Sequence, residues 1–237
     1  RALGRTIVDL AGVLARRRPD LLLLLGDRDE QLAAAVAGGH LNIPLAQAHA
    51  GERSGSIDEC NRHAITRFAH LHLAACRDSF DRLIRMGEEP FRVRLIGAPG
   101  IDAISEMNFL GRGELSAVVG ADLERLRYLV LLQHSVTTED RQSGRQIRES
   151  LAAIARSGLF CVALAPNADA GGRVIDAALR AAEKGGGLRR VVHLRHREYA
   201  SLLKEAEALV GNSSSGIIEA PYLAVPAINV GSRQALR

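Results

Sequence analysis

The sequence predicts an α/β protein built from two Rossmann-like domains, each with a doubly wound parallel sheet, that face each other across a cleft. Three observations favour this class. Apolar runs of strand length alternate with helical patterns along the chain. The alternation weakens once, between residues 107 and 127, and then starts again. Polar clusters follow the strands, at the carboxyl ends where open α/β sheets bind ligands.

The first domain is expected to span residues 1–108. Apolar residues recur at helical spacing from Ile7 to Leu14, so an amphipathic helix opens the chain and ends near Pro19. The uninterrupted apolar run at residues 21–25 predicts a parallel strand that is buried on both faces. Further strands are expected at residues 44–48, 71–75 and 93–96, with helices between them.

The second domain is expected to span residues 109–237, after a hinge within residues 107–127 that shows no clean strand. Its strands are predicted at residues 128–132, 159–164, 191–194, 208–210 and 227–230. Each connection runs from strand through loop and helix to the next strand, which predicts parallel pairing in both domains.

Three carboxylates, Asp27, Glu52 and Asp58, occur in the loops that follow the first two strands. Because adjacent parallel strands end at the same edge, these groups can face one pocket and act as general acids or bases. Arg28 can pair with one of them or with a phosphate. The alternative is that loop carboxylates only cap the helices after them, and for any one of the three alone the two interpretations have equal support.

A short hydroxyl-rich turn at residues 211–216 follows a predicted strand and precedes a predicted helix. Backbone N–H groups at a helix N-terminus suit a phosphate. Glu219 lies about one helical turn past Ser215, where its carboxylate can accept hydrogen bonds from ribose hydroxyls. The competing interpretation is an ordinary serine N-cap.

Composition excludes several classes. Aromatic residues make up 3% and Trp is absent, so stacking platforms for single-stranded nucleic acid are scarce. The net charge of +4 comes from scattered Arg residues, which argues against a nucleic-acid partner. Three widely spaced Cys residues favour a reducing compartment. Apolar runs are too short to span a bilayer, and no signal peptide opens the chain, so we expect a cytoplasmic protein without a membrane partner.

Metal binding is not expected. The pairs His70/His72 and His193/His196 have spacings that could ligate a metal, but no third ligand lies near either pair in the sequence, and they are interpreted as structural. No G-x-G-x-x-G motif follows a strand, which argues against an NAD dehydrogenase.

Six motifs occur in the order seen in the hydrolysing UDP-N-acetylglucosamine 2-epimerases, and the chain resembles that family over nearly its whole length. They are Gly26-Asp27-Arg28, residues 49–58 with 62–66, Gln133-His134 with Val136-Thr137-Thr138, Pro166-Asn167 with residues 169–172, residues 211–219, and Arg233-Gln234. The resemblance implies a GT-B-like fold and a homo-oligomer. It also implies that a first strand, its loop and a final helix found in the family are missing at the two ends.

The resemblance assigns residues to roles. It implies catalytic roles for Asp27, His49, Glu52, Asp58 and His134, and substrate binding by Arg28, His63, Ser213, Ser214, Glu219 and Arg233. No cofactor is implied. The family reaction eliminates UDP from UDP-N-acetylglucosamine to give 2-acetamidoglucal, which is hydrated to N-acetylmannosamine, a precursor for sialic- or legionaminic-type acids. Because some relatives carry a carboxylate at the position of His49, the base at C2 is left open among His49, Glu52 and Asp58.

Two alternatives from other classes remain at the level of sequence. The first is a glycosyltransferase that shares the two-domain architecture and a UDP-sugar donor. The second is a non-catalytic protein that binds a nucleotide. The sequence also leaves open which 2-acetamido sugar is bound and whether its carrier is UDP or GDP.

Overall fold

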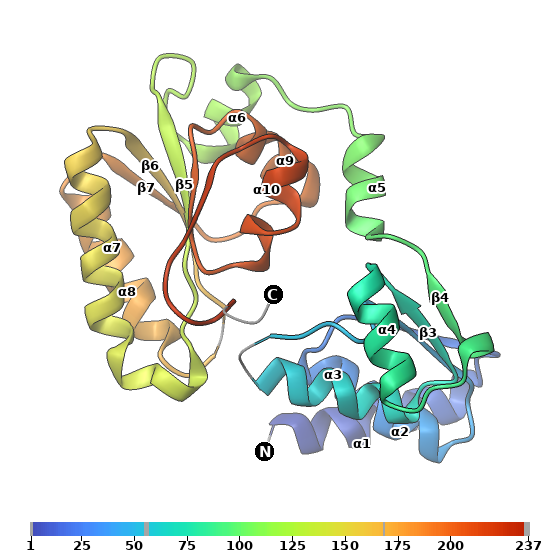
Figure 1. The fold of residues 1–237 in the computed structure, drawn as a ribbon. Coiled ribbons are helices and arrows are strands. Elements are labelled where there is room, and N and C mark those ends of the chain that lie inside the picture. The colour runs from blue at the N-terminus through green and yellow to red at the C-terminus, as the bar shows by residue number, and fades with distance from the viewer. Residues whose placement is uncertain (1, 55–56, 168, 235–237) are drawn as a thin grey trace. The chain divides into compact units, whose positions relative to one another are not determined.

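A computed structural model describes residues 2–54, 57–167 and 169–234 (Figure 1). The chain divides into two compact units, Arg1–Pro99 and Gly100–Ala235. We call them unit 1 and unit 2 and describe each by itself. The division falls earlier in the chain than the 108/109 boundary expected from the sequence, because helix α5 (Pro99–Ser105), apart from its first residue, groups with the second unit.

Unit 1 contains one parallel sheet of four strands in the order β1-β2-β3-β4. Helix α1 (Ala2–Arg17) precedes β1 (Leu22–Leu25), and α2 (Asp29–His40), α3 (Ile57–Phe68) and α4 (Arg77–Arg85) connect the strands in turn. The other strands are β2 (Leu45–Ala48), β3 (Leu71–Ala74) and β4 (Val93–Leu95), the last preceded by a 3-10 turn, η1 (Pro90–Arg92). The opening helix and all four strands predicted in this half are confirmed.

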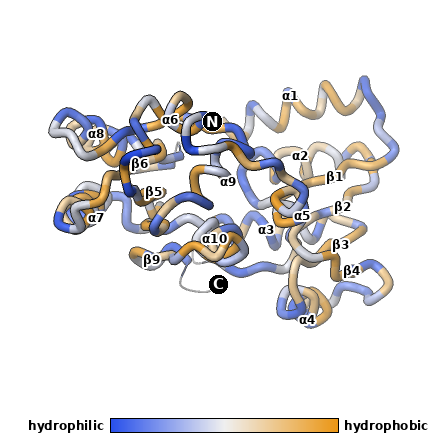
Figure 2. Tube along the Cα trace, turned by 90° about the horizontal axis from the view of Figure 1, so that it is seen from above, coloured by the Kyte–Doolittle hydropathy of each residue, from blue (hydrophilic) through white to orange (hydrophobic). Residues whose placement is uncertain are grey.

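The core of unit 1 lies on one face of this sheet. Leu24 and Leu45 point toward α2 and α3, and Ala74 and Val93, on the same face by register, pack against α4. Strand β1 appears as an apolar stretch along the trace in Figure 2. The expectation that residues 21–25 are buried on both faces is wrong, since Leu23 is 61% exposed. Among the described residues β1 is an edge strand, and the core clusters cover only one of its faces.

Unit 2 contains a parallel sheet of five strands in the order β7-β6-β5-β8-β9. The strands are β5 (Tyr128–Leu132), β6 (Phe160–Leu164), β7 (Leu188–Val191), β8 (Leu209–Gly211) and β9 (Ala227–Asn229). Two longer helices, α7 (Ser143–Ser157) and α8 (Gly172–Lys184), lie on one face, and α6 (Arg112–Val119), α9 (His196–Lys204) and α10 (Glu219–Tyr222) lie on the other (Figure 1). Two 3-10 segments, η2 (Thr137–Gln142) and η3 (Ser214–Gly216), follow β5 and β8.

Strand β5 is the centre of unit 2 because its side chains alternate between two cores. Tyr128 and Val130 belong to the cluster with α6, α9 and α10, whereas Leu129 and Leu131 belong to the cluster with α7 and α8. Both faces of this sheet are therefore covered, as the doubly wound prediction requires.

One strand of unit 2 is displaced from its predicted position. The strand expected at residues 191–194 is β7, which runs from Leu188 to Val191. Arg189 and Arg190 interrupt the apolar pattern, yet Leu188 is 8% exposed and Val192 is 69% exposed. The Arg190 guanidinium bonds to Asp176 on α8, so a charged residue occupies a strand position on the α8 side of the sheet because a helix carboxylate pairs with it.

Candidate functional site

The carboxyl ends of β1 and β2 bring together three of the predicted catalytic residues. Asp27 follows β1, and His49 and Glu52 follow β2. Nδ1 of His49 lies 2.5 Å from Oε1 of Glu52, and their side chains are 16% and 13% exposed. Adjacent strand ends therefore place an imidazole and two carboxylates in one small region.

Arg62 on α3 joins these groups. Its guanidinium contacts the Asp27 carboxylate, lies 3.4 Å from Oε2 of Glu52, and donates to the backbone carbonyl of His49 at 2.8 Å. The side chain is only 2% exposed. Arg62 falls within a family-like motif of the sequence, but the resemblance assigns it no role. Its helical spacing from Ile65 and Thr66 places it on the buried face of α3.

Buried hydrogen bonds hold the backbone of Arg62 against β2. The Gln47 side-chain amide on β2 donates to the Arg62 carbonyl at 3.0 Å, and the Thr66 hydroxyl donates to the Gln47 side-chain oxygen at 2.8 Å. Gln47 and Thr66 are both fully buried. Since buried polar groups are costly when unpaired, this network gives α3 one register against β2.

The turn between His49 and Glu52 is tightly packed. Gly51 has φ +75°, and a Cβ there would lie 2.5 Å from the Ser79 carbonyl oxygen and 2.8 Å from Cγ of Leu83. Arg82 on α4 donates to the Gly51 carbonyl at 2.5 Å. Only glycine fits this backbone without displacing α4, so the turn that presents Glu52 is set by packing against that helix.

Asp58, Arg28 and His63 lie around this group. Arg28 Nη1 is 3.6 Å from the Asp58 carboxylate, near the N-terminus of α3. His63 Nε2 is 3.9 Å from Glu59. Burial lowers the pKa of His63, with the nearby Glu59 carboxylate opposing that shift. Residues 55 and 56 of the 49–58 motif lie outside the described residues.

In unit 2, His134 lies just after β5 and is held by two other motifs. The Asn212 side chain accepts a hydrogen bond from the His134 N–H at 2.7 Å and donates to the His134 carbonyl at 2.8 Å. The Asn167 N–H donates to Nδ1 of His134 at 3.2 Å. Asn212 is 2% exposed. The motifs near residues 134, 167 and 212 therefore meet, and Asn212 contributes contacts that no pattern in the sequence indicates.

The hydroxyl-rich turn differs from its prediction in one respect. Instead of one helix after Gly211, the 3-10 turn η3 is followed by α10, which has four residues. Gly216 and Pro221 make a longer helix unfavourable here. Ser213 caps η3 by accepting from the Ser215 N–H at 3.3 Å. Any phosphate here would depend on hydroxyls and turn N–H groups more than on a helix dipole.

Tyr199 on α9 contacts the hydroxyl-rich turn. Its hydroxyl contacts the Ser215 hydroxyl, and burial raises the pKa of Tyr199 to about 12. Ser215 is 5% exposed, whereas Ser213 and Ser214 are half-buried. The two serines that the resemblance assigns to substrate are thus the more accessible ones.

Glu219 and Arg233 lie near the same strand end. Oε2 of Glu219 is buried and has no hydrogen-bond partner among the described residues. Arg233 Nη1 and the Gln234 side-chain amide both donate to the Asn212 carbonyl, at 3.2 and 3.1 Å. The buried Oε2 of Glu219 is suited to accept a hydrogen bond from a ligand hydroxyl.

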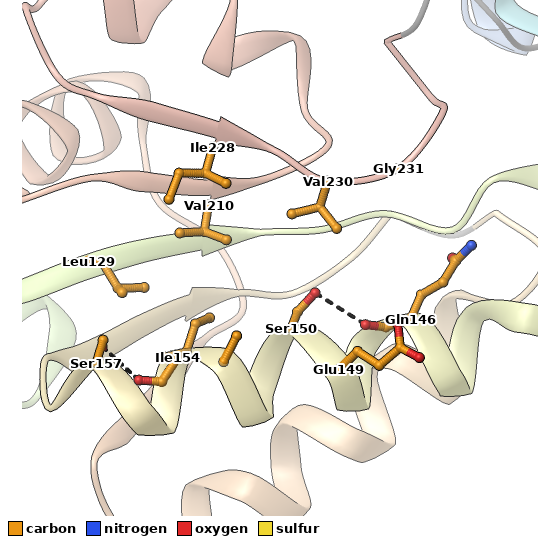
Figure 3. A pocket seen from close by; sticks show the side chains of 11 residues that line it. Leu129, Gln146, Glu149, Ser150, Ile154, Ser157, Val210, Ile228, Val230 and Gly231 are labelled. Atoms are coloured by element: carbon orange, nitrogen blue, oxygen red, sulfur yellow. Dashed lines mark hydrogen bonds between the residues drawn. The ribbon is translucent and has the colours of Figure 1, made fainter.

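Two pockets in the described part of unit 2 differ in their relation to the predicted site residues. One, of about 990 Å³, lies beyond β6 and includes Asn167 and Asp169 from the family-like motif together with Arg173 and Arg190. The other, of about 480 Å³, lies between α7 and the strands β5, β8 and β9 (Figure 3). Its lining is mostly apolar, with Leu129, Ile154 and Val210, and includes none of the predicted site residues.

No group of three or more His, Cys, Asp or Glu side chains within residues 2–54, 57–167 and 169–234 is arranged to hold a metal ion. In the described part of the chain, no helix is both long and apolar enough to cross a membrane. His70 Nδ1 accepts from the Leu45 N–H at 3.2 Å, and His72, which is fully buried, lies 3.0 Å from Glu88.

Comparisons with known proteins agree with the resemblance. The family model described as UDP-N-acetylglucosamine 2-epimerase matches residues 1–237. The chain is 38% identical over 237 residues to the Legionella pneumophila UDP-N,N'-diacetylbacillosamine 2-epimerase (hydrolyzing), and it covers 63% of that protein. It is 34% identical over 221 residues to the Campylobacter jejuni GDP/UDP-N,N'-diacetylbacillosamine 2-epimerase (hydrolyzing), of which it covers 57%.

The fold also matches a solved structure. The Methanocaldococcus jannaschii UDP-GlcNAc 2-epimerase, crystallised with UDP-GlcNAc and UDP, aligns with a TM-score of 0.79 and 20% identity. The alignment covers 96% of this chain and 64% of that one.

Proposed function

Because the chain belongs to the UDP-N-acetylglucosamine 2-epimerase family, we propose that it forms part of a hydrolysing 2-epimerase acting on a nucleotide-linked 2-acetamido sugar. The products are the free sugar with inverted configuration at C2 and a nucleoside diphosphate. The observation that carries the proposal is the group of Asp27, His49 and Glu52 around the buried Arg62, with Asp58 beside Arg28.

The reaction takes place in two steps. In the first, a base removes the proton from C2 while the bond from C1 to the diphosphate oxygen breaks, which leaves a C1–C2 double bond and releases the diphosphate. In the second, water adds across that bond, with the hydroxyl at C1 and a proton delivered to C2 from the opposite face. Two groups that exchange protons on opposite faces are therefore required.

Unit 1 supplies the groups suited to proton transfer. Glu52 is fixed by His49 at 2.5 Å and by Arg62 at 3.4 Å, whereas Asp58 lies 3.6 Å from the partly exposed Arg28. We propose that Glu52, with His49, and Asp58 act on the two faces of C2, and that Asp27 keeps Arg62 in place.

Unit 2 supplies groups suited to the nucleotide. Hydroxyls of Ser213 and Ser214 and the cation of Arg233 are suited to the diphosphate, and the buried Oε2 of Glu219 to a ribose hydroxyl. His134 is suited to the departing diphosphate oxygen. Neutralising the charge that develops on this leaving group lowers the barrier to elimination.

A substrate panel tests the proposal. The full-length protein is incubated with UDP-N-acetylglucosamine, UDP-N,N'-diacetylbacillosamine and GDP-N,N'-diacetylbacillosamine, and products are identified by mass spectrometry and NMR. We expect release of UDP or GDP with a free C2-inverted sugar from at least one of them. Formation of a nucleotide-linked epimer would indicate a non-hydrolysing enzyme. Turnover only when a sugar acceptor is added would indicate a glycosyltransferase.

A further inference from the structure

The end of strand β8 approaches β5 unusually closely. Leu132 pairs with Gly211, and the Asn212 N–H donates to the Leu132 carbonyl at 3.1 Å. Gly211 has φ +144°, and a Cβ there would lie 2.0 Å from the Leu132 carbonyl oxygen. Only glycine permits this approach, which brings the next side chain, Asn212, against the backbone of His134.

Beyond this point the Asn212 side chain continues the strand pairing. Its Oδ1 accepts from the His134 N–H at 2.7 Å, and its Nδ2 donates to the His134 carbonyl at 2.8 Å. A side-chain amide has one acceptor and one donor in the geometry of a peptide group, so it satisfies both backbone groups of His134 after the sheet has ended. At 2% exposure, Asn212 makes these bonds away from solvent.

The Asn167 N–H sets the tautomer of the His134 ring, and Asn212 holds the His134 backbone that places Nδ1 within reach of this N–H. Because Nδ1 accepts from the Asn167 N–H at 3.2 Å, the proton of the neutral ring lies on Nε2. In this tautomer the ring offers an N–H donor at Nε2. Such a donor suits an oxygen that gains negative charge, and this is what a leaving diphosphate requires.

Asn212 also connects the other nucleotide-binding candidates. Its carbonyl accepts from Arg233 and Gln234, and the residue after it, Ser213, begins the hydroxyl-rich turn. We propose that Asn212 is a positioning residue, which holds the Nε2–H of His134 in register with Ser213 and Arg233. This inference rests on the proposed function, because it assigns His134 to the leaving group.

The test compares two isosteric substitutions in the full-length protein. Asn212→Asp keeps the acceptor for the His134 N–H but removes the donor to its carbonyl. The control is Asn229→Asp on β9, an exposed residue whose amide donates to the Gly231 carbonyl at 3.5 Å. We expect Asn212→Asp to lower kcat by roughly tenfold to a hundredfold with a smaller change in KM, and the control to match wild type.

A second readout does not depend on turnover. In ¹⁵N-histidine NMR of the UDP-bound protein, we expect the His134 ring to be the Nε2–H tautomer in wild type and a mixture in Asn212→Asp. A wild-type ring protonated on Nδ1 would overturn the inference, as would an Asn212→Asp enzyme with wild-type kcat. If the wild-type protein lacks epimerase activity but the His134 tautomer still changes in Asn212→Asp, the proposed function fails while the positioning role of Asn212 stands.

Discussion

The Arg62 guanidinium contacts the Asp27 carboxylate and thereby joins the middle of α3 to the end of β1. Arg62 is 2% exposed and the Asp27 side chain 16% exposed. A charge this deeply buried is tolerated because carboxylates and a carbonyl surround it. The pair therefore links the stability of unit 1 to the geometry of its candidate catalytic group.

Replacing Arg62 should destabilise unit 1 strongly. Arg62→Ala leaves the Asp27 carboxylate without this partner, and breaking a buried pair costs about 3 kcal/mol. Since the chain has no Trp, urea unfolding is best followed by circular dichroism. The matched control is Arg77→Ala, which breaks an exposed pair with Asp81 on α4 and should cost less than about 1 kcal/mol. Equal effects of the two changes would contradict the structural role of Arg62.

Gly51 should tolerate no side chain. In Gly51→Ala, the left-handed backbone and the clash with Ser79 and Leu83 together should cost about 2–4 kcal/mol and displace Glu52. Gly97→Ala is the matched control, because Gly97 has φ +79° and nothing within 4 Å of its added Cβ. The control isolates backbone strain, at about 1 kcal/mol. Unfolding midpoints that coincide for the two variants would show that the turn is not packed as described.

Acidification should weaken the fold through the partly buried His63. Burial lowers the pKa of His63 below its ordinary value of 6.5. The unfolded ring then gains its proton at a higher pH than the folded ring. The contribution of neutral His63 to the free energy of unfolding is therefore fully present above about pH 6.5. It is lost as the pH falls through the lowered pKa of His63 in the folded state. The free energy of unfolding should decline less steeply from pH 7.5 to 5.5 in His63→Gln than in wild type. Identical slopes would contradict a lowered pKa of His63 in the folded state.

The hydroxyl-rich turn should contribute to nucleotide affinity. The double change Ser213→Ala, Ser214→Ala removes two hydrogen bonds to a charged group, worth roughly 3 kcal/mol or about a hundredfold in Kd. Calorimetry with UDP measures the loss directly. Ser157→Ala, at the end of α7, removes a hydroxyl that donates to the Ile154 carbonyl and should leave Kd unchanged. An unaltered Kd in the double variant would exclude this turn from the nucleotide site.

Much of the fold could be predicted because strands in parallel sheets are continuous apolar runs. The apolar run at residues 128–132 matches β5, and all of its residues except Leu132 are buried. The pattern of apolar runs failed where charge occupies a strand, as at Arg190 in β7, whose partner Asp176 lies on another element. The same pattern wrongly predicted that Leu23 is buried, because the apolar character of a strand does not say which of its faces are covered.

The candidate site could be predicted only in part. Asp27 and Glu52 were identified because acidic residues at adjacent strand ends lie close together, and the structure brings both to Arg62. Arg62 itself was given no role, since a charged helix residue is usually solvated. Asn212 was given no role for a different reason. Its partner, His134, lies 78 residues earlier in the chain, and no local sequence pattern indicates that contact.

Deuterium incorporation at C2 tests the central claim most directly. The full-length protein, its Asp58→Asn variant and its Glu52→Gln variant are supplied with the nucleotide sugar in D₂O. If these carboxylates exchange the C2 proton, the wild-type product carries deuterium at C2 and UDP or GDP is released without an acceptor. Each variant should then lose about 10²–10⁴ in kcat while its affinity for the nucleotide stays within a few-fold. A wild-type product that keeps the substrate's own C2 proton, or variants with near-normal turnover, would contradict the account.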